Sequence, residues 1–152
     1  MFQHSRILAA ALALATVCTP AFALDNAKPI TQSDKAWATV RKAVRQGDVV
    51  SIELRFETDY PGYSGETIYE KLDDGAIDNV IYLSAGDQRF PLHRTDGKVA
   101  APAELKLKFN YNPDKNPRVG DWKAQFDAPP ADAGDIMLTL PNVAPIGPIT
   151  LK

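Results

Sequence analysis

The fold is decided by residues 50–57, which read Val50-Ser51-Ile52-Glu53-Leu54-Arg55-Phe56-Glu57. Apolar side chains occupy every second position, and polar or charged side chains occupy the positions between them. Successive side chains of a β-strand point to opposite faces, so this alternation is typical of a strand with one face in a core and the other in water. The stretch therefore predicts a half-buried strand in a sheet protein.

The same alternation recurs further along the chain, at 105–109, 122–127 and 136–140. An apolar run at 79–84 is followed by a turn at 85–87 and a return at 89–92, which is typical of a hairpin, and a last short run lies at 149–151. Prolines and glycines fall between these runs, where they do not interrupt a hydrogen-bonded ladder. The sequence thus predicts an all-β fold, a two-sheet sandwich of about seven or eight strands.

Residues 34–46 allow two interpretations. Their apolar positions have helical spacing, Ser33 is placed to cap a helix, and Gly47 is placed to end it. The same residues can form a first strand that pairs with 49–58 through the turn Arg45-Gln46-Gly47-Asp48. We favour the strand because its partner follows at once and because the turn has hairpin chemistry.

Four segments together give the chain a resemblance to a known class of domains. They are Val44-Arg45-Gln46-Gly47-Asp48-Val49-Val50, then Asn79-Val80-Ile81-Tyr82-Leu83 with Phe90-Pro91-Leu92, then Trp122-Lys123-Ala124-Gln125-Phe126, and Leu138-Thr139-Leu140-Pro141-Asn142-Val143-Ala144-Pro145-Ile146. In this pattern of strands and turns the chain resembles small exported bacterial domains of immunoglobulin-like fold. The resemblance implies an immunoglobulin-like sandwich over residues 36–152 and a place in the cell envelope. Such domains share no catalytic residues, so no functional residue is carried over.

Residues 1–23 are predicted to be a cleaved secretory signal peptide. Arg6 supplies a positive charge, residues 7–17 form an apolar run, and Ala21-Phe22-Ala23 supplies the small residues that signal peptidase needs. The run is shorter than the about 20 apolar residues that span a bilayer, so we expect no transmembrane segment in the mature chain. Lipid attachment at Cys18 would need a small residue before it, where Val17 stands. We therefore expect a soluble protein that is periplasmic or secreted.

Removal of 1–23 from the 152 residues would leave a chain of one-domain size, with a polar, flexible leader at 24–35 and the domain at 36–152. It would also remove the only cysteine and Arg6, which changes the formal net charge from −2 to −3. His93 would remain as the single imidazole. This composition excludes thiol catalysis, a structural disulfide, a Cys/His zinc site and a strongly basic nucleic-acid footprint. We expect no cofactor, no metal and no nucleic-acid partner.

One short motif has the beginning of a nucleophile elbow, Gly62-Tyr63-Ser64-Gly65-Glu66. The fifth position should be glycine, and the motif belongs to a strand-to-helix turn of a larger α/β sheet. His93 would have to be the base, since no other histidine remains in the mature chain. We interpret the motif as a tyrosine-bearing surface loop and assign no catalytic residue.

A second motif has the alternate oxygen side chains of a calcium loop, Asn112-Pro113-Asp114-Lys115-Asn116. Pro117 stands where such a loop needs glycine, and Lys123 stands where it needs a bidentate glutamate. The segment is therefore predicted to be a proline-stiffened loop with local Asn and Asp turns. The acidic stretch 73–79 lacks correct ligand spacing and is predicted to be a solvated turn.

The most unusual local feature is aromatic, because Tyr60, Tyr63 and Tyr69 fall within one short segment. Tyrosine supplies contact area at low entropic cost and is favoured in binding loops. We predict Tyr60, Tyr63, Ser64 and Tyr69 as binding residues. The alternative, that Tyr69 packs in the core and Tyr60 covers a sheet edge, is equally compatible with the sequence.

These observations favour a non-enzymatic binding or accessory domain whose partner is a protein of the cell envelope. The contact surface would be loop 59–66, with loop 112–121 as a second candidate, and an inhibitor of a hydrolase is a special case because it needs only one protruding loop. The alternative is a small carboxylate-dependent enzyme or binding module that acts on envelope glycans, with its acids drawn from 57–78.

Overall fold

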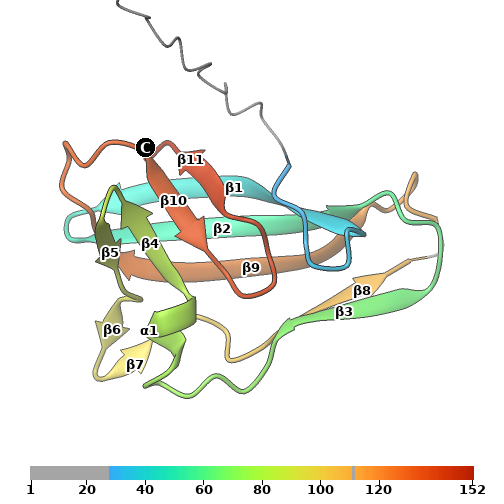
Figure 1. Ribbon diagram of the computed structural model, residues 1–152, viewed down its shortest axis with the longest axis horizontal. Coiled ribbons are helices and arrows are strands. Elements are labelled where there is room, and N and C mark those ends of the chain that lie inside the picture. The colour runs from blue at the N-terminus through green and yellow to red at the C-terminus, as the bar shows by residue number, and fades with distance from the viewer. Residues whose placement is uncertain (1–27, 111) are drawn as a thin grey trace, which may run out of the picture.

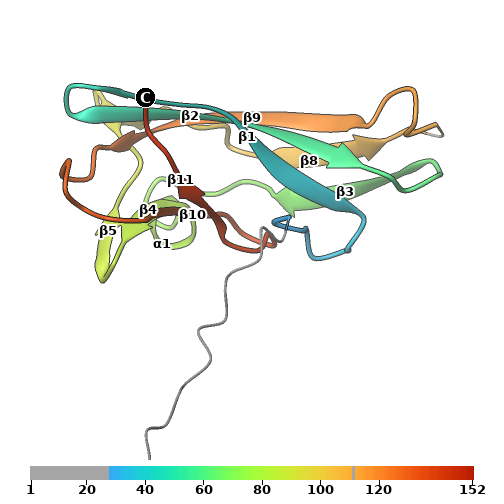
Figure 2. The ribbon, with the colours of Figure 1, turned by 90° about the horizontal axis from the view of Figure 1, so that it is seen from above.

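The computed structural model describes residues 28–110 and 112–152, so the predicted signal peptide lies outside the described residues. The protein is all-β, and its antiparallel strands lie in two layers (Figures 1 and 2). One layer contains β1, β2 and β9, and the other contains β3, β4, β10 and β11 (Figure 2). The predicted all-β, sandwich-like architecture is confirmed at this level.

The first layer is a three-stranded antiparallel sheet in the order β1-β2-β9. Its strands are β1 (Ala36–Gln46), β2 (Val49–Thr58) and β9 (Arg118–Asp127). The choice of a strand over a helix at 36–46 is confirmed, because β1 pairs with β2 from Ala36 opposite Thr58 to Gln46 opposite Val49. The tight turn between them is possible because Gly47 adopts a φ of +60°, which glycine reaches without steric cost.

Outside this three-stranded sheet, the strands form two larger groups. A four-stranded sheet has the order β11-β10-β4-β5, with β4 at Tyr82–Ala85, β5 at Gln88–Phe90, β10 at Ile136–Thr139 and β11 at Ile146–Ile149. A two-stranded ribbon joins β3 (Ser64–Tyr69) to β8 (Leu105–Phe109). A small hairpin, β6 (Arg94–Thr95) and β7 (Lys98–Val99), completes the strands.

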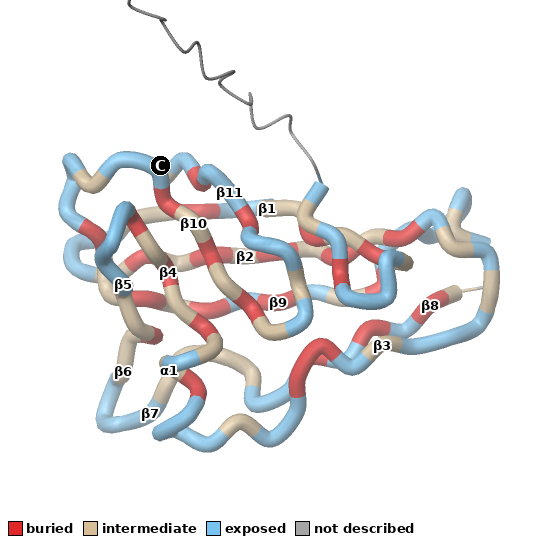
Figure 3. The backbone as a smooth tube through the Cα atoms, in the orientation of Figure 1, coloured by how far each residue is buried: buried red, intermediate tan, exposed pale blue. Residues whose placement is uncertain are grey.

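The core lies between the layers and follows the predicted alternation. In β2 the four alternating core residues are at most 1% exposed, namely Val50, Ile52, Leu54 and Phe56, whereas the positions between them are half-buried (Figure 3). The same holds for β8, β9 and β10, whose inward side chains include Leu107, Trp122 and Leu138. Burial of this apolar surface is the main term that stabilises the two layers against each other.

Two local elements differ from the sequence prediction. The run at 79–84 is not a strand throughout, because α1 (Ile77–Val80) precedes β4. The Asp73 carboxylate accepts hydrogen bonds from the backbone N–H groups of Gly75 and Ala76, at 3.0 and 2.7 Å, and this bond pattern bends the chain into a turn before the strand begins. The first residues of the ribbon strand β3 belong to the segment 59–66, which the sequence predicts as a loop because these residues show no apolar alternation.

The described part of the predicted flexible leader also differs from expectation. We call residues 29–33 the strap. Thr31 is 1% exposed, and the strap forms bridges from Ile30 to Trp37 and from Thr31 to Val143. Hydroxyl groups of Thr31 and Ser33 donate to the Glu66 carboxylate at 2.7 and 2.6 Å, and the Ser33 N–H donates to it at 3.0 Å. The polar side chains that suggested a loose leader are therefore the groups that fix the strap to β3.

The free edge of β1 is covered near both of its ends. The Ala38 N–H donates to the Pro29 carbonyl at 2.9 Å, next to the bridge from Ile30 to Trp37. At the other end, the Arg45 N–H donates to the Lys152 carbonyl and the Lys152 N–H donates to the Ala43 carbonyl, both at 3.0 Å. Between these contacts the pairing of β1 with β2 is interrupted by a register shift between Val40 and Lys42.

Candidate functional site

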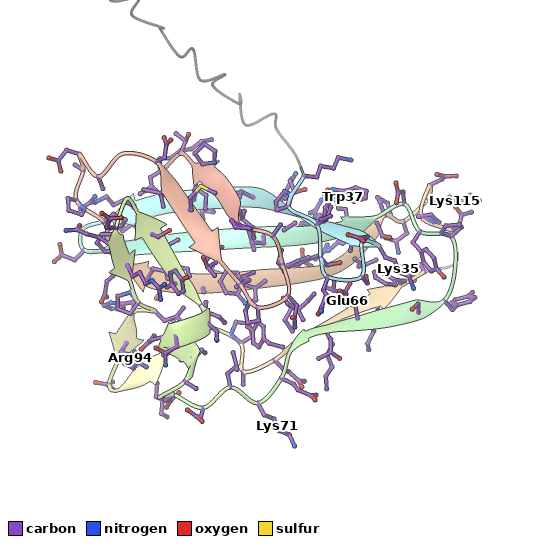
Figure 4. All side chains as sticks on the ribbon, in the orientation of Figure 1. Lys35, Trp37, Glu66, Lys71, Arg94 and Lys115 are labelled. Atoms are coloured by element: carbon purple, nitrogen blue, oxygen red, sulfur yellow. The ribbon has the colours of Figure 1, made fainter. Side chains whose placement is uncertain are left out.

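The two loops that the sequence favours as contact surfaces lie together at one end of the molecule (Figure 1). We call residues 59–64 and 112–118 the tip. The Thr58 N–H donates to the Pro117 carbonyl at 2.9 Å, and Ser64 pairs with Phe109 at the start of the β3–β8 ribbon. Both loops are thus held from their flanking strands, which fixes their relative position. Lys35 and Lys115 lie at this end, whereas Arg94 lies at the other (Figure 4).

Tyr63 is the most exposed large apolar residue of the described chain, with 81% of its surface accessible. Ile30, in the strap, is the other one in this class, at 44%. Large apolar side chains are normally withdrawn from water, and an exposed tyrosine on an anchored loop is typical of a contact surface. Ser64 is exposed beside it and is the first residue of β3.

The Tyr60 side chain packs between the tip loop and the β3–β8 ribbon. Its ring is half-buried and lies 6.0 Å from the Phe109 ring, at an angle of 57°. The Lys35 ammonium lies 4.5 Å from the centre of the same ring, and a Cβ at Gly62 would lie 3.1 Å from the ring edge. The Tyr60 ring is therefore clamped between the ribbon and the loop, and it covers the sheet edge while shaping the loop that carries Tyr63.

Tyr69 is a core residue, which corrects its prediction as a binding residue. It is 5% exposed, and its hydroxyl accepts a hydrogen bond from the Trp122 indole N–H at 2.7 Å and donates one to the Pro102 carbonyl at 2.9 Å. Burial raises the pKa of the Tyr69 phenol above its ordinary value, and the hydrogen bond from Trp122 partly opposes that rise. Of the four predicted residues, the tip thus contains Tyr60, Tyr63 and Ser64.

The structure does not bring Ser64 and His93 together. Ser64 begins β3 at the tip, whereas His93 lies between β5 and β6 at the other end of the molecule (Figure 1). The backbone N–H of His93 donates to the Gln125 carbonyl at 2.9 Å, and its Nδ1 lies 2.8 Å from Asp127 Oδ1. Among the described residues, a hydroxyl nucleophile at Ser64 therefore has no imidazole base within reach.

The carboxylates of 57–78, which the glycan-enzyme alternative would use, are largely engaged in holding the fold. Glu57 accepts from the Thr39 hydroxyl at 3.0 Å, and Glu66 anchors the strap. Asp73 holds the turn before α1, and Asp78 accepts from the Arg94 guanidinium at 2.7 Å. Four of the seven carboxylates in this range thus take part in contacts that hold the fold.

Loop 112–118 has the geometry of a self-contained turn. Asn112 Oδ1 accepts from the Lys115 N–H at 3.3 Å, and the Asn112 carbonyl accepts from the Asn116 N–H at 3.1 Å. Within 28–110 and 112–152, no group of three or more His, Cys, Asp or Glu side chains is placed to hold a metal ion. The Asn112 side chain therefore acts on the backbone of its own loop.

In comparisons with known proteins, no family, no curated protein and no solved structure matches the chain. The described residues also include no helix with the length and apolar character needed to cross a membrane. Function is therefore inferred from the tip and from the surface around it.

Proposed function

We propose that the protein is an exported, periplasmic or secreted, non-enzymatic binding domain whose tip contacts an envelope protein. A cleaved signal peptide at 1–23 and an immunoglobulin-like arrangement of the strands belong to the same proposal. The sequence pattern at the N-terminus supports export. The two-layer antiparallel fold supports a rigid scaffold with loops gathered at one end, which is how such folds present contact residues.

One observation carries the proposal, namely the exposure of Tyr63 on a loop that is anchored from two sides. The loop is held by the Thr58–Pro117 hydrogen bond and by the clamped ring of Tyr60. Because the loop is already ordered, little further entropy would be lost when Tyr63 enters a pocket of the partner. A protruding, pre-ordered loop of this kind also suits the special case of a hydrolase inhibitor.

The test is affinity capture from envelope extracts with the full-length protein and two matched variants. Tyr63→Ala removes the exposed ring at the tip, and Tyr82→Ala removes a half-buried surface ring at β4, which contacts Arg89. A tyrosine anchor contributes about 2 kcal/mol or more to binding, so we expect Tyr63→Ala to weaken retention of the captured protein by roughly thirtyfold. Tyr82→Ala should retain it. Equal retention by both variants would overturn the assignment of the tip.

A further inference from the structure

The outer face of the first layer contains a hollow of about 650 Å³, which we call the basic hollow. It is lined by cationic side chains from all three strands of the sheet, namely Arg41, Lys42, Arg55, Arg118 and Lys123. These residues lie on the side of the sheet that faces away from the core, where the strands expose their polar positions to water.

Only two carboxylates, Glu53 and Asp121, lie among these cations, and each is shared between two of them. Glu53 Oε1 lies 3.0 Å from Lys123 Nζ and 4.0 Å from Lys42 Nζ. Asp121 accepts from Arg118 Nε at 2.7 Å and lies 3.9 Å from Arg55 Nε. Among the residues that line it, the hollow thus has five cations and two acids, a surplus of three positive charges, in a chain whose formal net charge is −2.

Two details show that the surplus is not needed to hold the sheet. Arg41 is exposed and forms no ion pair with the described residues. It is the extra residue of β1 at the register shift between Val40 and Lys42. Bulges of this kind commonly re-aim a side chain near functional sites. Arg55 Nε is buried and donates no hydrogen bond in the described structure. Exposed ion pairs contribute little stability, so five cations around two acids stabilise the fold weakly.

The basic hollow is continuous with the tip through Arg118, which begins β9 directly after loop 112–117. A partner that holds the tip would therefore extend over the hollow. Arginine forms paired hydrogen bonds with carboxylates and is enriched at protein interfaces. Because the hollow and the tip share Arg118, a single protein ligand can cover both surfaces.

We propose that the basic hollow binds an acidic segment, rich in Asp or Glu, of the protein that contacts the tip. This inference rests on the proposed function, and it identifies the chemistry of the partner. The incoming carboxylates would neutralise the three surplus charges and supply acceptors to Arg41 and to the Arg55 guanidinium. Complementary charge of this kind speeds association and sets the orientation of the partner.

The test measures binding of a labelled oligoglutamate peptide by fluorescence anisotropy at low ionic strength. Arg41→Gln with Lys123→Gln removes two cations of the basic hollow, and Lys71→Gln with Lys98→Gln removes two exposed lysines elsewhere, so the two double variants have the same net charge. We expect the first double variant to weaken peptide binding about fivefold and the second to leave it nearly unchanged. Thermal unfolding of both should match the unaltered protein, since all four side chains are exposed.

Equal weakening by the two double variants, or no binding of the peptide at all, would overturn the inference. Vesicles that contain an anionic phospholipid are the second probe, and binding to them but not to the peptide would assign the hollow to a lipid surface instead. The variant Tyr63→Ala should bind oligoglutamate as the unaltered protein does. If it does so while also retaining the captured envelope protein, the tip assignment fails and the charge assignment of the hollow stands on its own.

Discussion

The two ends of β3 have opposite roles, although only a few residues separate them. At its outer end, Tyr63 and Ser64 are exposed at the tip, and at its inner end Ile68 and Tyr69 are buried in the core. The outer end is held by loop contacts, whereas the inner end is held by packing and by the bond from Trp122 to Tyr69. Tyr63 and Tyr69 are close together in sequence, yet the loss of one ring would change the contact surface and the loss of the other would change the core.

The largest loss of stability is expected from Tyr69→Ala. Truncation of a buried aromatic ring costs about 3–5 kcal/mol, and here it would also leave the Trp122 N–H and the Pro102 carbonyl without their partner. We expect a loss of this size in the free energy of unfolding, measured by urea denaturation. A loss below about 1 kcal/mol would show that Tyr69 is not the core residue that its burial indicates.

A smaller change at the same position is Tyr69→Phe, which keeps the ring and removes only the hydroxyl. The buried Trp122 N–H would then lose its acceptor, so we expect a loss of about 1–3 kcal/mol in the free energy of unfolding. The near-ultraviolet circular dichroism of Trp122 should change as well. An unchanged denaturation midpoint would contradict the hydrogen bond.

Because burial raises the pKa of Tyr69, the free energy of unfolding depends on pH in the alkaline range. In the unfolded chain the phenol ionises near its ordinary pKa of 10.0, whereas burial keeps it protonated in the folded protein at higher pH. The unfolded state then binds fewer protons above about pH 10, so the free energy of unfolding falls as the pH rises. We expect a shallower fall in Tyr69→Phe, measured by denaturation between neutral and alkaline pH. Parallel profiles for the two proteins would count against this role of the phenol.

The smallest expected change in stability comes from Tyr63→Ala at the outer end. An exposed side chain at a loop contributes little to folding, so the free energy of unfolding should shift by about 0.5 kcal/mol or less. The same urea titration used for Tyr69→Ala gives the measurement. A large loss here, with capture of the partner unchanged, would reverse the roles of the two ends.

In the first layer, β2 and the second half of β9 could be predicted from sequence because their core positions alternate strictly. In β3 the alternation fails for a physical reason, since the register shift between Thr67 and Tyr69 places the consecutive residues Ile68 and Tyr69 both in the core. The core role of Tyr69 further depends on Trp122, which is 53 positions away. A pattern of neighbouring residues in the sequence does not reveal the contact between Tyr69 and Trp122.

The tip and the basic hollow differ in how much of them the sequence contains. The tip was predicted as two loops, but their meeting depends on the contact of Thr58 with Pro117. The hollow was not predicted, because its cations belong to β1, β2 and β9 and each strand alone has the charge pattern of an ordinary solvated face. Antiparallel register places Lys42 and Lys123 opposite the same residue, Glu53.

The free edge of β1 is covered near both of its ends, and this covering affects self-association. An open strand edge is a template on which a second chain can add a strand and start aggregation. Here the strap covers the edge near Trp37, and Lys152 covers it near Ala43. The open middle of the edge has an irregular ladder and carries Arg41 and Lys42. A chain shortened to begin at Ala36 would uncover the part of this edge near Trp37, so the strap acts as a barrier to edge-to-edge assembly.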